Sequence, residues 1–309
     1  MPVNRLGYAC INETLKAQRP RVCANRGMIK RTFHEKGSGY AAELILQNAR
    51  DQLAILEWNE QHNIRFFRMS SDMLPWASEF NLLAEPLWPD IEAALAAVGD
   101  FARQHDHRIT MHPGPFNCLG SPNESVIANT IKDMELHGLL LDAINAPRSP
   151  HAKINIHVGG AYGEHEDTMD RFCRNVERLS ESVRSRLTVE NDDRPNLFSI
   201  SQLYRGIWQR TEIPIVFDSL HYEYGPADCP KSDALDLAVS TWPDGVVPVC
   251  HHSSSRKLHE DATCRMAKAH ADYIYEPFEC GAHTVDVMLE TKAKEAALLQ
   301  YRKQFCGPS

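Results

Sequence analysis

Eight short, mostly apolar segments, separated by stretches long enough to form helices, constrain the fold of this chain more than any other feature. Such runs are typical of strands that are buried on both faces of a parallel sheet. The eight segments are residues 5–10, 64–70, 108–113, 153–159, 187–192, 214–221, 246–253 and 284–291.

Helical patterns fill most of the intervals between these segments. The expected helices are residues 41–62, 90–104, 124–144, 164–184, 196–210, 233–240 and 292–305. Strands that alternate with helices indicate βαβ units and a parallel sheet. Eight strands in 309 residues indicate a closed barrel. We therefore expect an α/β protein with a single (β/α)8 TIM-barrel domain spanning residues 1–309.

Composition excludes several classes of protein. The sequence has no apolar run of transmembrane length and begins without a signal-peptide pattern, so we expect a cytoplasmic protein. The nine cysteines include no C-x-x-C pair, which argues against a disulfide framework or a thiolate zinc site. The net charge of −8 is unusual for a nucleic-acid binder but compatible with a metal enzyme that uses carboxylate ligands.

Ionisable residues occur near the C-terminal ends of six consecutive predicted strands, and barrel enzymes form their active sites at that end. From the third strand to the eighth they are His112, His157, Glu190, Asp218 with His221, His251 with His252, and Glu290. Buried groups of this kind need partners or metal ions. Histidine nitrogens and carboxylate oxygens suit Zn²⁺ or Mn²⁺. The set exceeds the needs of one ion, so we predict two or three ions and hydrolysis of a phosphate ester.

Two assignments stay open at this point. Asp72 follows the second predicted strand and is either an outer metal ligand or a helix N-cap. The seventh strand offers two adjacent histidines, His251 and His252, and the pattern alone does not select between them.

The chain resembles the UV damage endonuclease family from residue 5 to about residue 295, through blocks that occur in the same order. These blocks are Arg5-Leu6-Gly7-Tyr8, Phe67-Arg68-x-Ser-Ser, Met111-His112-Pro113-Gly114, His157-x-Gly-Gly-Ala-Tyr-Gly-Glu164, Glu190-Asn191-Asp192, Asp218-x-x-His221, His251 with its trailing serines, and Met288-Leu289-Glu290. The resemblance implies a barrel with Mn²⁺ as the most suitable ion, ahead of Zn²⁺, Mg²⁺ or Co²⁺. It also implies incision of duplex DNA immediately 5′ of cyclobutane pyrimidine dimers and 6-4 photoproducts.

The resemblance assigns eight ligands to three ions. It gives the first ion His112 and His157, and Glu190 bridges the first ion to the second. It completes the second ion with Asp218, His251 and Glu290, and gives the third ion His221 and His270. Glu190, Asp218 and Glu290 are the expected catalytic carboxylates. His270 enters only through the resemblance, because it lies outside the predicted strands.

The same resemblance implies contacts to UV-damaged double-stranded DNA. The expected contact residues are Tyr8, Arg68, Pro115, Phe116 and Asn117. Pro115 and Phe116 stand where some relatives have Gln and Tyr; a Phe side chain can still wedge between bases and stack on them. Val249 stands where some relatives have Lys, which leaves the third ion with one ligand fewer.

Two other functions remain open. An abasic-site endonuclease of the endonuclease IV type would use the same fold and metals, but a single-nucleotide pocket. A sugar isomerase or epimerase also presents His, Glu and Asp to divalent ions, but needs a closed pocket for a small molecule. For a DNA enzyme we expect a monomer, because DNA must reach the barrel mouth.

Overall fold

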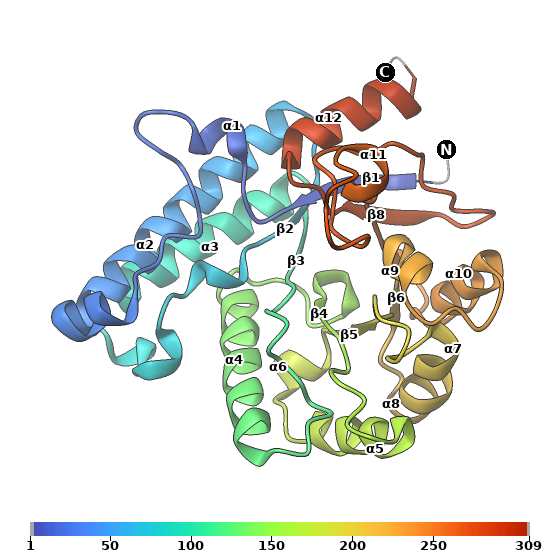
Figure 1. Ribbon diagram of the computed structural model, residues 1–309. Helices are drawn as coiled ribbons and strands as arrows, with labels where there is room; N and C mark the ends of the chain where they lie inside the picture. Colours follow the sequence, from blue (N-terminus) through green and yellow to red (C-terminus); the bar gives the residue numbers. More distant parts are fainter. Residues whose placement is uncertain (1–2, 308–309) are drawn as a thin grey trace.

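The predicted barrel is confirmed in a computed structural model that describes residues 3–307, so the ends of the predicted domain 1–309 lie outside the described residues. Its parallel strands run in the order β3-β2-β1-β8-β7-β6-β5-β4 (Figure 1). A parallel bridge between Met111 and Ile154 joins the two end strands. The strands are β1 Val3–Ala9, β2 Phe66–Arg68, β3 Arg108–Thr110, β4 Ile154–Ile156, β5 Leu187–Glu190, β6 Ile215–Asp218, β7 Val249–His252 and β8 Val285–Leu289.

Helices surround the strands, as Figure 1 shows. The α-helices are α1 Glu13–Lys16, α2 Lys30–Gln61, α3 Trp88–Gln104, α4 Glu124–Ala143, α5 His165–Val176, α6 Glu181–Arg184, α7 Ile200–Leu203, α8 Gln209–Thr211, α9 Ser219–Tyr224, α10 Lys231–Ser240, α11 Arg256–His259 and α12 Lys294–Phe305. Single 3₁₀ turns are η1 Ser71–Met73, η2 Ala77–Glu79, η3 Leu82–Ala84 and η4 Pro150–Ala152, and η5 Tyr204–Trp208 is a π-helical turn. Within residues 3–307, no helix is both long and apolar enough to cross a membrane.

Three helical regions differ from the sequence prediction. Helix α2 begins at Lys30 rather than at residue 41, and Gly37 breaks its helical geometry with a φ of 73°. Glycine reaches such a conformation easily. The helix is therefore interrupted at Gly37, and its first part does not continue the regular apolar pattern that begins at residue 41. The predicted helix 164–184 is divided into α5 and α6, and the predicted helix 196–210 is divided by the π turn η5.

Two apolar cores follow from the alternation of side chains along each strand. One core lies between the strands and helices and includes Phe67, Cys250 and Leu289. The smaller core contains residues of opposite parity on the same strands, together with Trp242, and it lies in the barrel interior. Its buried members are Ala9, Phe66, Val216, Trp242, Val249 and Met288.

A buried ion pair lies at the opposite end of the barrel interior from the strand C-termini. Arg108, the first residue of β3, places Nη1 2.8 Å from Oδ2 of Asp286 on β8. Both side chains are almost completely buried. The Arg108 guanidinium also donates to the carbonyl oxygens of Val247, Pro150 and His151. Its charge is therefore balanced by Asp286, and its N–H groups have hydrogen-bond acceptors.

Candidate metal centre

Glu190, the last residue of β5, lies at the centre of a group of histidines. Its carboxylate is fully buried. Oε1 is 3.1 Å from Nδ1 of His251 and 3.2 Å from Nδ1 of His221. Oε2 is 3.2 Å from Nε2 of His112 and 3.9 Å from Nε2 of His157. One carboxylate therefore faces imidazoles from four different strands or strand ends, an arrangement suited to a carboxylate that bridges two ions.

Each of three histidines uses its second ring nitrogen for a contact outside this group. His157 Nδ1 is 3.1 Å from Oδ1 of Asp192. His112 Nδ1 is 3.1 Å from the Pro113 carbonyl oxygen, and His251 Nε2 is 3.1 Å from Nζ of Lys153. Outer contacts of this kind fix the ring orientation and determine which nitrogen faces a metal. The nitrogens left facing Glu190 are therefore Nε2 of His157 and His112 and Nδ1 of His251.

The pKa values of the group reflect burial together with strong mutual attraction. Although burial opposes ionisation of Glu190, the nearby His251, His112 and His221 hold its pKa well below the usual range. Burial opposes the charged form of His157 as well, but the close approach of the Asp192 carboxylate and the Glu190 charge raise the pKa of His157 to about 8. Burial lowers the pKa of Lys153 to about 7. Such shifted groups, gathered in one cleft, indicate a functional site.

Asp218 combines a structural role with a free oxygen. It is the N-cap of α9, and Oδ1 accepts a 2.7 Å hydrogen bond from the backbone N–H of His221. The Asp-x-x-His spacing thus places His221 at the first turn of α9, where its side chain reaches Glu190. The other oxygen, Oδ2, is buried without a hydrogen-bond partner, and burial raises the pKa of Asp218 to about 7. An unpartnered buried carboxylate oxygen is what a bound cation would satisfy.

Glu290 extends the group on the side of β8. Its Oε1 contacts Nη1 of Arg68 in a short ion pair and lies 3.2 Å from Nδ1 of His251. Its Oε2 is 3.9 Å from Nδ1 of His270. His270 comes from the long segment between β7 and β8, where an antiparallel bridge to Ser255 holds it in place. The structure therefore brings all eight expected ligands to one end of the barrel.

The donor set fits divalent metal ions. Two triplets have ligand atoms that lie within 4.8 Å of one another: His112, His157 and Glu190 form the first, and Glu190, Asp218 and His251 form the second. Both triplets mix imidazole nitrogen with carboxylate oxygen, and both share Glu190. A cavity of about 500 Å³ opens beside them and is lined by His112, His157, His221 and Glu290 among others.

The structure answers the questions that the sequence left open. His251 faces Glu190, whereas His252 points to the other side of β7, where its ring nitrogens meet Ser219 Oγ at 2.7 Å and the Glu276 carbonyl oxygen at 2.9 Å. Asp72 lies in the turn η1, where Ser70 and not Asp72 is the N-cap. Asp72 also lines a different cavity from the candidate ligands. Val249 is a member of the inner apolar core.

The expected DNA-contacting residues in and near the loop after β3 differ in how exposed they are. Phe116 is 68% exposed at its tip, and Pro115 lines the candidate metal cavity. Asn117 also lines that cavity but is buried, with its amide donating to the Gly114 carbonyl oxygen and to Asp133. Arg68 lies within the cavity wall, held by Glu290.

Tyr8 requires a correction. We expected a contact with DNA, but its side chain is fully buried and lies on the helix-facing side of β1. Its hydroxyl donates to Asn59 Oδ1 at 2.7 Å and accepts from Asn12 Nδ2 at 2.9 Å. Burial raises the pKa of the Tyr8 hydroxyl. The alternation along β1 explains this placement, because Ala9 belongs to the inner core and its neighbour Tyr8 must then face outward.

Three residues around the ligands were missed from the sequence. Lys153 and Asn155 precede His157 at intervals of two along one strand, and Asn155 donates to Glu190 Oε2. Asp192 holds His157 from the end of β5. The alternation of polar and apolar residues in Lys-Ile-Asn-Ile-His was a usable signal, because residues two apart on a strand face the same side.

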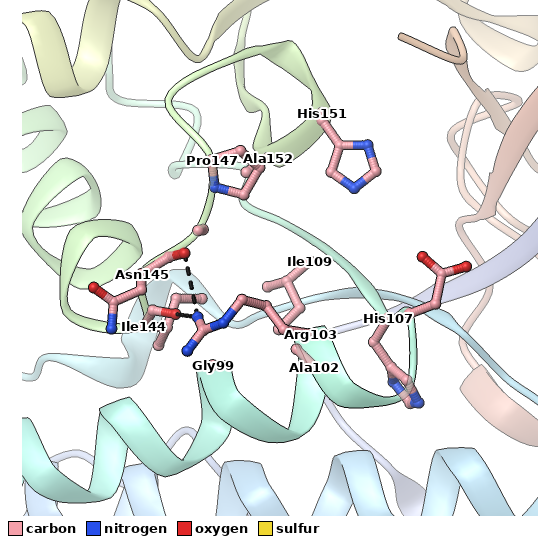
Figure 2. A pocket seen from close by; sticks show the side chains of 12 residues that line it. Gly99, Ala102, Arg103, His107, Ile109, Ile144, Asn145, Pro147, His151 and Ala152 are labelled. Carbon is pink, nitrogen blue, oxygen red and sulfur yellow. Dashed lines mark hydrogen bonds between the residues drawn. The ribbon is translucent and has the colours of Figure 1, made fainter. Parts of the chain in front are cut away.

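A separate cavity of about 270 Å³ lies away from this centre (Figure 2). Gly99, Ala102 and Ile109 contribute to its walls, and Arg103 donates there to the carbonyl oxygens of Ile144 and Asn145. Its lining contains none of the eight expected ligands. We therefore place the chemistry at the strand C-termini.

Asp192→Asn is expected to weaken binding of Mn²⁺ to the metal-free protein by about 10- to 100-fold, the usual effect of losing the outer partner of a ligating histidine. The physical reason is that His157 would lose the carboxylate that orients its ring. Isothermal titration calorimetry measures the change. Asp228→Asn is a matched control, because Asp228 accepts hydrogen bonds from Ser199 and Ser201 instead of a candidate ligand. Equal affinities in both variants would contradict the assigned role of Asp192.

Comparison with known proteins agrees with the geometry. A sequence model of the UV-endonuclease UvdE family matches residues 4–307. The chain is 33% identical to the UV-damage endonuclease of Schizosaccharomyces pombe over 97% of its own length and 50% of that relative. It is 30% identical to the putative UV-damage endonuclease of Acanthamoeba polyphaga mimivirus, over 97% and 91% of the two chains.

A solved structure supports the same relationship. The crystal structure of SacUVDE superposes with a TM-score of 0.84 at 30% identity and covers 98% of this chain and 99% of that one. The chain spans about half the length of the fungal relatives and nearly the whole length of the viral one. On these matches, which cover the barrel and every candidate ligand, the chain belongs to the UV-endonuclease UvdE family.

Proposed function

We propose that this chain is a DNA repair endonuclease that cuts duplex DNA immediately 5′ of UV photoproducts and uses two or three divalent ions, with Mn²⁺ as the preferred one. The observation that carries the proposal is Glu190, surrounded by four histidines at the mouth of a barrel of this family. Relatives named as UV-damage endonucleases support the choice of substrate. We also propose that residues 1–309 act as one catalytic domain, since all eight strands belong to one sheet.

The ligand assignment is part of this proposal. His112 and His157 would hold the first ion, and Glu190 would bridge to a second ion that Asp218, His251 and Glu290 complete. His221 and His270 would hold the third. When bound, such ions polarise the phosphodiester and promote attack by water.

The residues of the chain would contribute position and charge. Asp192 and Lys153 hold the rings of His157 and His251 in the orientation that presents one nitrogen to the cavity. Arg68 pairs with Glu290 and so fixes that carboxylate on the cavity wall. Phe116 is exposed on the loop after β3, between two residues that line the metal cavity, although its own side chain lines the neighbouring cavity that Asp72 also lines. It would enter the duplex at the lesion, where stacking replaces that of the displaced bases.

Plasmid nicking tests the proposed function. Supercoiled plasmid is prepared UV-irradiated, acid-depurinated and untreated, and each sample is incubated with the protein and Mn²⁺, with and without EDTA. We expect nicking of the irradiated plasmid, loss of nicking in EDTA, and ends that carry 3′-hydroxyl and 5′-phosphate groups. Cutting confined to depurinated plasmid would identify an abasic-site endonuclease. Absence of cutting in all three samples would refute the endonuclease proposal.

Phe116→Ala is expected to reduce incision of irradiated DNA by roughly 10- to 100-fold, because stacking of an aromatic side chain on a base contributes about 1–3 kcal/mol. Single-turnover incision of a duplex with one thymine dimer measures the change. Leu83→Ala is the control, since Leu83 is also a strongly exposed apolar residue but lies in η3, outside the loop after β3 and outside the linings of both the metal cavity and the cavity that Phe116 lines. Unchanged incision by Phe116→Ala, with unchanged melting temperature, would remove Phe116 from the recognition surface.

A further inference from the structure

An ion pair connects two segments at the mouth of the candidate metal cavity. Nζ of Lys268 lies 2.6 Å from Oδ2 of Asp193. Lys268 belongs to the segment between β7 and β8, and Asp193 to the segment that follows β5. Both residues line the cavity. The side chains are 26% and 30% exposed, so the pair is accessible to a ligand that enters the mouth.

Lys268 is placed differently from Arg68, another cation of the cavity wall. Arg68 is buried against Glu290, which is itself an expected metal ligand. The partner of Lys268 is instead a partly exposed carboxylate outside the expected ligand set. Partly exposed ion pairs contribute little to stability, so the lysine can exchange one anionic partner for another at small cost.

The sequence position of Lys268 puts it close to the expected chemistry. It lies two residues before His270, whose ring approaches Glu290 to 3.9 Å. Asp193 directly follows Asp192, which contacts His157. The pair therefore joins the segment that carries His270 to the segment that supports His157. A strand of DNA whose phosphate reaches the ligands must pass close to this pair.

We infer that Lys268 binds a backbone phosphate of the incised strand next to the phosphate that is cut, and that Asp193 holds Lys268 until this phosphate replaces it. The inference rests on the proposed function and adds a specific substrate contact to it. Lysine binds phosphate as a compact point charge, and the exchange releases counterions from the DNA. Asp193 is thus a competitor of the DNA for the same ammonium group.

Competition predicts effects of opposite sign for the two partners. Lys268→Met removes the phosphate contact and weakens DNA binding. Asp193→Asn removes the competitor, keeps the shape of the side chain and strengthens DNA binding. An ion pair that only ties the two segments together predicts instead that both substitutions act in the same direction, because either one breaks it.

The test is single-turnover incision by the Mn²⁺-loaded protein of a duplex with one thymine dimer, at several salt concentrations. The half-saturating protein concentration is expected to rise about fivefold for Lys268→Met and to fall about two- to fivefold for Asp193→Asn, the scale of one exposed charge contact. The salt dependence on a log–log scale should become shallower by about 1 for Lys268→Met, as for the loss of one phosphate contact. The double variant should match Lys268→Met, and Lys268→Arg should stay near the unsubstituted protein.

Lys303→Met is the matched control, because this exposed lysine lies on α12 beside the start of β1, away from the cavity, and should change nothing. Equal half-saturation for Lys268→Met and the unsubstituted protein would overturn the inference, as would weaker binding by Asp193→Asn. These outcomes leave the proposed function intact as long as the unsubstituted protein cuts irradiated DNA. If it cuts no DNA at all, the proposed function fails together with this inference.

Discussion

Glu190→Gln is expected to reduce incision of irradiated DNA by on the order of 10³-fold. Glu190 is the carboxylate that both ligand triplets share, so the substitution removes one negative charge from each. Metal ions contribute several kcal/mol to transition-state stabilisation in such sites. Each 1.4 kcal/mol corresponds to a factor of about ten in rate. Nicking of irradiated plasmid at saturating Mn²⁺ measures the loss.

The control for Glu190→Gln is Glu60→Gln. Glu60 is also a carboxylate near histidines, with Oε2 2.9 Å from Nε2 of His107, but it lies at the end of α2, outside the metal cavity. Glu60→Gln should retain incision within about twofold, since it removes no ligand and no substrate contact. Near-normal incision by Glu190→Gln would show that Glu190 is not the shared ligand, and the metal assignment would then have to be rebuilt around Asp218 and Glu290.

Asp286→Ala is expected to lower the free energy of unfolding by about 3–5 kcal/mol, the range for removal of one partner from a buried ion pair. Arg108 would keep its carbonyl contacts but would lose its counter-charge inside the barrel. Asn4 would also lose its 2.8 Å hydrogen bond to Asp286 Oδ1. Urea unfolding of the metal-free protein measures the change without a contribution from bound ions.

Glu124→Gln serves as the control for Asp286→Ala. Glu124 pairs with Arg178 on the protein surface, where both side chains are exposed, and an exposed pair contributes about 0–1 kcal/mol. If the two variants lost similar stability, the backbone carbonyls around Arg108 would be sufficient to hold its charge. The pair with Asp286 would then have little energetic role.

The strands and most of the ligands could be predicted because two simple signals coincide in this sequence. Each strand is a short apolar run, and on the six strands from β3 to β8 an ionisable residue lies near the C-terminal end, as with His112, Glu190 and Glu290. Barrel geometry brings these strand ends together, so the prediction does not require the loop structures. The roles of the ligands toward particular ions came from family resemblance and stay predictions.

The features that the sequence alone could not decide depended on local parity and on long-range packing. The DNA contact of Tyr8 was implied by the family resemblance, but the inner position of its neighbour Ala9 turns the Tyr8 side chain outward. His251 and His252 are chemically identical in the sequence, and only their directions across β7 separate them. Lys268 and Asp193 are 75 positions apart in the sequence (268 − 193), so no local pattern predicts their contact.

The inner apolar core has a kinetic consequence for any ions at the mouth. Phe66, Val216, Val249 and Met288 lie between the ligand residues and the Arg108–Asp286 pair, together with the buried side chains of Asn155 and Thr188, so packed side chains rather than a pore occupy the described barrel axis. Ions held by Glu190 and its neighbours would then be exchanged through the mouth of the barrel, where we propose that DNA binds. DNA bound at the mouth would therefore block the loss of ions, and a chelator would remove ions from the DNA complex only as fast as the DNA dissociates.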